Sequence, residues 1–116
     1  MNITILTGNL GKNPDSFFSP EGTHVVSFNL AFRSGKDRTG WIKVTAFNKL
    51  ADLAEQYLQK GDRVSVTGSL DQEKWTTQEG EKRTAYKLIA NQIEFIKLHK
   101  NDGENPHDDN FVHEEE

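Results

Sequence analysis

The sequence predicts an all-β protein: a five-stranded Greek-key barrel with one α-helix between the third and fourth strands, followed by a disordered acidic tail. Three observations predict this architecture. Several short segments alternate apolar with polar residues, which is the period of a strand with one buried face. A single segment near the middle changes to the spacing of an amphipathic helix. Polar segments that contain glycine separate these elements, as turns and loops do.

Length and composition limit the classes to consider. A chain of 116 residues fits one small domain, and the absence of cysteine excludes disulfides, thiolate zinc sites and a cysteine nucleophile. The N-terminus has no basic segment followed by an apolar run, and no window approaches the roughly 18 apolar residues of a membrane span. We therefore expect a cytoplasmic protein with no membrane contact and no cofactor.

Charge is distributed unevenly along the chain. The formal net charge is -4, but residues 1–100 hold all fourteen Lys and Arg and eleven of the eighteen acidic residues. Residues 101–116 hold seven acidic residues and no base. A mildly basic body with an acidic tail is compatible with a nucleic-acid partner. We expect a folded domain over residues 1–98 and a disordered tail over 99–116, because the tail has too few apolar residues to form a core.

The first two strands are predicted over residues 3–10 (ITILTGNL) and 26–33. Gly8 and Gly11 interrupt the first as bulge or bend positions would, and residues 19–22 (SPEG) have the composition of a type I turn. The second strand alternates apolar and polar residues throughout. Large aromatic residues are more often core than ligand contacts, so we assign five to the core, with Phe18 beside the turn the least certain: Phe17, Phe18, Phe28, Phe32 and Phe95.

The third strand, residues 41–47 (WIKVTAF), has an unusual distribution of side chains. Ile42, Val44 and Ala46 share one face and form an ordinary core set. The other face holds Lys43 and Thr45 and should be solvent-exposed, yet it also carries Trp41 and Phe47. A loop over residues 34–40 (SGKDRTG) is expected to join this strand to the second.

Residues 48–61 change to a helical period. Apolar residues recur at helical spacing, with Asn48 as the expected N-cap and Gly61 as the stop; the stripe comprises Leu50, Leu53, Ala54, Tyr57 and Leu58. A fourth strand is predicted over residues 63–75, a loop with Gly80 over 76–81, and a fifth strand over 82–96.

Five strands with one helix between the third and fourth is the layout of the OB-fold, whose outer face commonly binds oligonucleotides. Four motifs occur in order: ITILTGNLGKNP, WxKVxAFNKLA, AxxYLxKGDxVxVxGxL and KWTxxxG. Over residues 1–97 the chain therefore resembles the bacterial single-stranded DNA-binding protein family. The resemblance implies a non-catalytic, nucleoid-associated homotetramer that coats unpaired DNA in replication, recombination and repair, without sequence preference; a dimer is the alternative.

The resemblance also implies roles for particular residues. Trp41, Phe47 and Trp75 match positions on which bases stack in the family. Binding without sequence readout needs such aromatic faces together with cations along the phosphates. Basic residues on or beside the same strands, and in the glycine-bearing segments that could close over the DNA, are the expected phosphate contacts: Lys43, Lys49, Lys74, Lys12, Lys36, Arg38, Lys82 and Arg83.

Two features depart from the family pattern. Asp71 and Glu73 share the face of Trp75 and should weaken the local attraction for phosphate. Family members recruit replication and repair proteins through an acidic tip with an apolar terminal pair. The tail echoes that tip, but residues 113–116 (HEEE) follow it, which argues against recruitment by that route; the residues concerned are Asp108, Asp109, Phe111 and Val112.

Other functions remain to be weighed. A primosomal replication-restart scaffold would share the OB-fold, and a protein-interaction OB module would bury Trp41 and Trp75 against a partner. Trp75 taken alone could equally be a core residue. A metal site built from His99, His107, Asp108, Asp109 and His113 has no rigid element to hold it. No serine has a histidine at a spacing that suggests a catalytic pair, so we expect no enzyme activity.

Overall fold

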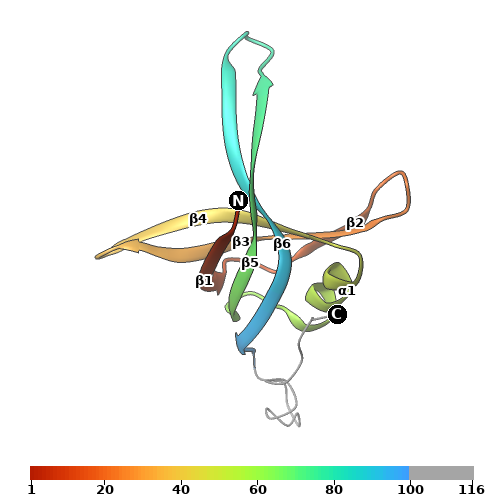
Figure 1. Cartoon of the computed structure of the whole chain (residues 1–116), viewed down its shortest axis with the longest axis vertical. Helices are drawn as coiled ribbons and strands as arrows, with labels where there is room; N and C mark the ends of the chain where they lie inside the picture. Colours follow the sequence, from red (N-terminus) through yellow and green to blue (C-terminus); the bar gives the residue numbers. More distant parts are fainter. Residues whose placement is uncertain (100–116) are drawn as a thin grey trace.

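Six strands and one helix follow one another along residues 1–99, the part of the chain that the computed structural model describes (Figure 1). Of residues 99–116, which we expected to be disordered, all but His99 lie outside the described residues, as do the four residues expected to recruit partners. The elements are β1 (Thr4–Leu10), β2 (Asp15–Phe18), β3 (His24–Gly35), β4 (Arg38–Phe47), α1 (Asn48–Tyr57), β5 (Arg63–Thr76) and β6 (Lys82–Lys97).

The strands form one sheet that closes on itself. Their order is β1-β5-β6-β4-β3-β2, and an additional pairing of β1 with β3 completes a ring of five strands. β4 and β6 are parallel, whereas every other described pair is antiparallel. The ring and the helix between β4 and β5 are those of an OB-fold, so the predicted fold class is confirmed.

The ring closes where β1 changes partners. Residues 4–9 of β1 pair with β5, and residues 8–10 pair with β3, so Gly8 and Asn9 belong to both ladders. A Cβ atom at Gly8 would lie 2.1 Å from the carbonyl oxygen of Ala31. Only glycine permits this close approach of two backbones.

The barrel interior is filled by alternate residues of the strands. Fully buried aliphatic side chains come from β3, β4, β5 and β6, and α1 adds Leu50, Ala51 and Ala54 at one end. The remaining helix residues of the predicted stripe, Leu53 and Tyr57, are half-buried. The interior residues of the strands are Leu10, Val26, Phe28, Leu30, Val44, Ala46, Val64, Val66, Leu88, Ala90, Ile93 and Phe95.

The short strand β2 was not expected. It pairs with β3 alone, outside the ring, and all four of its side chains are exposed. The prediction that Phe17 and Phe18 belong to the core is therefore wrong, because an edge strand outside the ring has no interior beneath it. Phe18 stacks on the ring of His24 with centroids 4.8 Å apart. The predicted turn at residues 19–22 is present, with the amide of Gly22 donating to the carbonyl of Ser19 at 2.8 Å.

The helix begins differently from the prediction. Phe47 occupies the N-cap position, no side chain caps the helix, and Asn48 is its first residue with φ of 59°. Asparagine tolerates this left-handed conformation better than most residues, which explains its presence without a capping role. At the other end Gly61, with φ of 92°, follows the helix at a turn. No helix within residues 1–99 is long and apolar enough to cross a bilayer.

Two hairpins extend beyond the barrel (Figure 1). The β3–β4 hairpin is longer than predicted, because pairing continues to Gly35 and Arg38 and leaves a turn of only Lys36 and Asp37. The φ of Asp37 is 61°, which suits a tight hairpin turn. The β5–β6 hairpin ends at the predicted loop, where the amide of Gly80 donates to the carbonyl of Thr77 at 2.9 Å.

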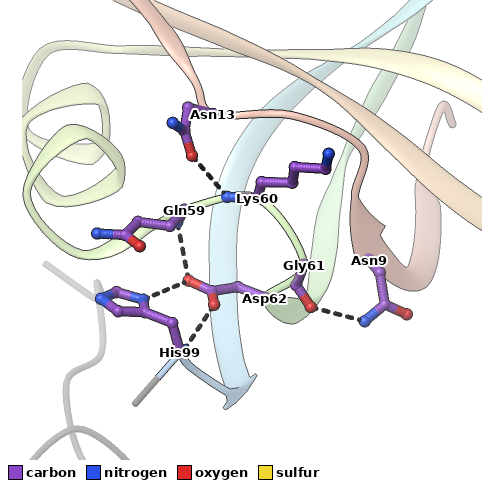
Figure 2. A network of polar contacts seen from close by, with 7 residues as sticks. All are labelled: Asn9, Asn13, Gln59, Lys60, Gly61, Asp62 and His99. Atoms are coloured by element: carbon purple, nitrogen blue, oxygen red, sulfur yellow. Dashed lines mark hydrogen bonds and ion pairs between the residues drawn. The ribbon is translucent and has the colours of Figure 1, made fainter. Parts of the chain in front are cut away.

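A buried carboxylate fastens the end of β6 to the segment between α1 and β5. Asp62 is 2% exposed and accepts hydrogen bonds from the amides of Gln59 at 2.8 Å and His99 at 2.6 Å. The ring Nδ1 of His99 lies 3.1 Å from Oδ2 of Asp62, the oxygen that also accepts from the amide of Gln59. Figure 2 shows these contacts beside those that Asn13 and Asn9 make with the backbone of residues 60 and 61.

Candidate nucleic-acid interface

The outer face of β4 carries the aromatic residues that the sequence singled out. Trp41 is 60% exposed and Phe47 is 38% exposed, and Lys43 between them is exposed as well. Val44 and Ala46, which alternate with them, are fully buried in the barrel. The two faces of this strand are therefore oriented as predicted, with bulky aromatic rings directed outward and the core set inward.

Thr45 is the exception on this face. It was expected to be solvent-exposed, but its side chain is only 5% exposed and its hydroxyl has no hydrogen-bond partner among the described residues. Thr45 lies between Ser27 of β3 and Ile89 of β6 in the sheet. Strands flank Thr45 on both sides, and the larger side chains of Lys43 and Phe47 precede and follow it on the same face of β4.

Trp41 lies over the end of β1. A Cβ atom at Gly11 would be 2.4 Å from Cζ3 and 2.7 Å from Cη2 of the indole. The glycine thus leaves room for the ring, which is held near the segment that carries the exposed Lys12. This contact places the β1–β2 connection beside the first predicted stacking residue.

Trp75 lies on the β5–β6 hairpin and is 49% exposed. Arg83 is directly opposite it on β6, so the two side chains share one face. Lys74 and Lys82 belong to the alternate face of the hairpin. Three cations near the hairpin tip were predicted to contact phosphate, and the strand register places only Arg83 on the same face as the indole of Trp75.

Two lysines meet where β4 and β6 run in parallel. Lys43 pairs in register with Lys87, whose ammonium contacts the carboxylate of Glu73 at 2.8 Å. The hydrogen bond and positive charge of Lys87, with a smaller contribution from Lys43, lower the pKa of Glu73 below its ordinary value. Glu73 thus offsets the repulsion between the two lysines and neutralises part of this basic surface. The sequence did not indicate Lys87 as a binding residue, because its neighbour Lys43 lies on β4, which is not consecutive with β6 along the chain.

The remaining predicted cations lie beyond the two ends of this aromatic face, and alternation along β4 places Arg38 on the side of the strand opposite Trp41. Lys36 and Arg38 lie at the tip of the β3–β4 hairpin, and Lys49 lies in the first turn of α1. A cavity of about 360 Å³ opens beside this hairpin, and three arginines line it: Arg33, Arg38 and Arg63. Two of these, Arg33 and Arg63, were not singled out in the sequence, because each is an isolated base in an alternating strand.

Other chemistry has little support in the described residues. Residues 1–99 contain no cluster of three or more His, Cys, Asp or Glu that could hold a metal. The proposed partners of His99 at positions 107–113 lie outside the described part, and His99 itself contacts Asp62.

Ser16 has a histidine neighbour that the spacing of serines and histidines in the sequence did not suggest. Its hydroxyl lies 2.7 Å from Nε2 of His24, and Nδ1 of the same ring lies 2.5 Å from Asp52. Nε2 is also 3.2 Å from Glu55, so the buried ring is held between two carboxylates. This arrangement fastens β2 and β3 to α1; the second carboxylate competes with the serine for Nε2, unlike the arrangement around a nucleophile.

Comparisons with known proteins agree with this geometry. The profile of the single-strand binding protein family matches residues 1–96. A single-stranded DNA-binding protein of Neisseria meningitidis serogroup A is 33% identical, in an alignment that covers 96% of the chain and 69% of the relative. One from Xanthomonas campestris pv. campestris is 34% identical, with 83% of the chain and 60% of the relative covered.

Proposed function

The chain belongs to the single-strand binding protein family, and from this premise we propose that it binds single-stranded DNA without sequence preference. The proposed path follows the outer face of β4 and continues onto the β5–β6 hairpin. One observation carries the proposal. Exposed rings of Trp41, Phe47 and Trp75 share an outer surface with Lys43 and Arg83, while the opposite face of β4 forms the core.

The chemistry of this surface suits an unpaired strand. Every base has a π-face, and stacking on an aromatic side chain contributes about 1–3 kcal/mol per base with little dependence on sequence. Lysine and arginine attract the phosphates and add a dependence on salt. Stacking and charge attraction are non-covalent and require no catalysis. The proposed role is therefore to protect and organise unpaired DNA in replication, recombination and repair.

A titration of tryptophan fluorescence with oligo-dT at two salt concentrations tests the proposal. The chain has only two tryptophans, both of them proposed stacking residues, so binding should quench the emission. We expect Trp41→Ala and Trp75→Ala each to weaken binding about 5- to 100-fold, the range that corresponds to loss of one stacked base. Higher salt should weaken binding of the unaltered protein.

Tyr86→Ala provides a matched control for the hairpin. Tyr86 is exposed and aromatic, but it belongs to the face opposite Trp75, where its hydroxyl accepts a hydrogen bond from Gln72 at 2.7 Å. Its loss should leave the affinity nearly unchanged. Absent quenching in the unaltered protein, or equal affinity in both tryptophan variants, would instead favour a protein-interaction module or a scaffold of replication restart.

We also propose that the chain self-associates through β1, as a homotetramer with a dimer as the alternative. Ile3 and Ile5 are each 62% exposed at the start of this strand. Within the described residues, positions 4–7 pair with β5 on one side and with no strand on the other. An exposed strand edge with apolar side chains is a ready site for pairing with a second chain.

Light scattering after size exclusion tests this self-association. The expected mass is four times the 13.2 kDa of one chain, or twice that mass for a dimer. Ile5→Lys should shift the mass toward that of one protomer, because it places a charge in the proposed interface. A monomeric mass for the unaltered protein would contradict the proposal.

The acidic residues 101–116 supply a further part of the proposed function. Their seven acids against a basic body suggest competition with DNA for the same cations. Removal of residues 101–116 should tighten binding of oligo-dT at low salt, and the difference should fade as salt rises. Equal affinity with and without these residues at low salt would leave recruitment of replication and repair proteins as their remaining proposed role.

A further inference from the structure

A small cavity opens on the outer face beside the edge strand β2. Its volume is about 230 Å³, and its walls include Phe17 of β2, Phe47 of β4, and the side chains of Lys43 and Lys87. Val25 and Thr45 form part of its lining between these walls. The aromatic ring on β2 was not among the residues that the sequence assigned to binding.

The sheet register fixes the relation between the two phenylalanines. Phe17 and Phe47 are both directly opposite Val25, one on each neighbouring strand. All three side chains therefore lie on the same side of the sheet, and the outer two are separated by about 10 Å, twice the strand spacing. This is about twice the centroid distance of an offset-stacked aromatic pair. One flat ring fits between them.

Exposure distinguishes these rings from core residues. Phe17 is 53% exposed and Phe47 is 38% exposed, whereas Val25 between them is buried. Exposed phenylalanine on both sides of a shallow hollow leaves apolar surface without a partner. A planar aromatic ligand would cover both rings at once.

The charges at one end of the cavity indicate what carries that ligand. Lys43 and Lys87 lie side by side on β4 and β6, one row beyond Thr45. Lys87 is tied to Glu73, but its neighbour Lys43 has no ion pair among residues 1–99. An occupant with a flat ring and an adjacent anionic group matches this arrangement, and a nucleotide of a DNA strand has both.

Thr45 adds a polar group to the floor. Its hydroxyl lacks a partner in the described residues, although the side chain lines the cavity. A change of χ1 rotamer moves its hydroxyl group to the position that the methyl group now occupies. A bound ring with a hydrogen-bonding edge could then supply the missing partner.

We infer that Phe17 and Phe47 form the two walls of a slot for one base of the single strand, with Lys43 and Lys87 on the phosphates beside it. This inference rests on the proposed function and extends it to β2. The edge strand then has a binding role in addition to its pairing with β3. Phe17 becomes the fourth aromatic residue of the interface.

Substitutions at Phe17 test the slot. Phe17→Ala should weaken binding of oligo-dT about 5- to 50-fold, within the range for one stacked base. Phe17→Tyr should retain the affinity, whereas Phe17→Leu should not, because leucine is apolar but has no π-face. Phe18→Ala serves as the matched control, since Phe18 is exposed on the same strand but stacks on His24 outside the cavity.

A second measurement locates the contact directly. Photo-crosslinking with a strand that contains 5-iodouracil, followed by mass spectrometry, should yield adducts on the peptides that carry Phe17 and Phe47. Circular dichroism of each variant shows whether the fold is retained. If the unaltered protein binds oligo-dT and Phe17→Ala binds equally well, the slot is overturned while the proposed function stands. Full affinity in Phe17→Leu would show that apolar bulk suffices at this position, which would overturn stacking on Phe17. Failure of the unaltered protein to bind at all would overturn both.

Discussion

The carboxylate of Glu73 on β5 lies 2.8 Å from the ammonium of Lys87 on β6, next to the lysine of β4 that points out among the exposed aromatic residues. The ion pair removes one cation from the surface on which we propose that phosphates lie. An anionic ligand has to compete with Glu73 for Lys87, so the pair weakens binding while it holds the lysine in place.

Glu73→Gln should therefore tighten binding of oligo-dT. We expect an affinity about 3- to 10-fold higher at low salt, with a salt dependence steeper by about one phosphate contact. Titrations at several salt concentrations measure both quantities. Glu79→Gln, an exposed acid in the loop at the hairpin tip, is the control for a general change in net charge. An unchanged affinity in Glu73→Gln would show that Lys87 takes no part in binding, and a weaker affinity would show that positioning of Lys87 by Glu73 outweighs the competition.

Lowering the pH should raise the affinity for oligo-dT, as we expect for Glu73→Gln. The pKa of Glu73 is lowered by its hydrogen bond and attraction to Lys87. The stabilisation from the pair is thus present above the unfolded-state pKa and is lost as pH falls through the folded-state pKa. Protonation releases Lys87, so affinity for oligo-dT should rise over this acidic range. The rise should be smaller in Glu73→Gln than in the unaltered protein; equal pH profiles would contradict this role for Glu73.

Gly11→Ala should displace the ring of Trp41. A Cβ atom there would lie well inside contact distance of the indole, which is exposed and free to move outward. In a Trp75→Phe background Trp41 is the only tryptophan, so its emission spectrum should change and oligo-dT affinity should fall about 3- to 10-fold. Gly35→Ala is the control, because its Cβ would meet nothing closer than 3.4 Å. An unaltered spectrum would show that the ring does not depend on Gly11.

Thr45→Val should stabilise the free protein. The substitution keeps the shape of the side chain and removes a buried hydroxyl that has no partner among the described residues. The free energy of unfolding should rise by about 1 kcal/mol, as expected for removal of an unsatisfied buried group. Urea denaturation measures the change. A loss of stability would indicate that the hydroxyl is satisfied in solution, for example by water.

Asp62→Ala should destabilise the fold strongly. It would leave the amides of Gln59 and His99 without their buried acceptor, at a cost of about 2–4 kcal/mol. The midpoint of urea denaturation should fall accordingly, while Glu94→Ala on the exposed face of β6 should change it little. A small effect for Asp62→Ala would mean that the segment between α1 and β5 rearranges to satisfy these groups.

Local sequence patterns predicted much of this structure. Alternation correctly predicted that Val44 and Ala46 lie inside and that Trp41 and Phe47 lie outside, because successive side chains of a strand point to opposite faces. The helix stripe and the loop at Gly80 followed from local composition in the same way. These features depend on residues close together in the chain.

Features that depend on distant residues were missed. The pairing of Lys43 with Lys87 requires knowledge that β4 and β6 are neighbours, which no local pattern contains. The buried positions of His24 and Asp62 depend on acceptors or donors from other elements. Phe17 was assigned to the core because large aromatic residues usually are, and its four-residue strand is too short to show alternation.

The β5–β6 hairpin has a consequence for motion. From Leu70 to Thr76 every residue of β5 is exposed, so this half of the hairpin has no core beneath it. Backbone hydrogen bonds without buried side chains open at low free energy, and amide hydrogens there should exchange with solvent long before those of the barrel. We therefore expect the segment that carries Trp75 to open locally more often than the ring of strands. A bound DNA strand that lies across both the barrel and the hairpin would slow amide hydrogen exchange most at the hairpin tip.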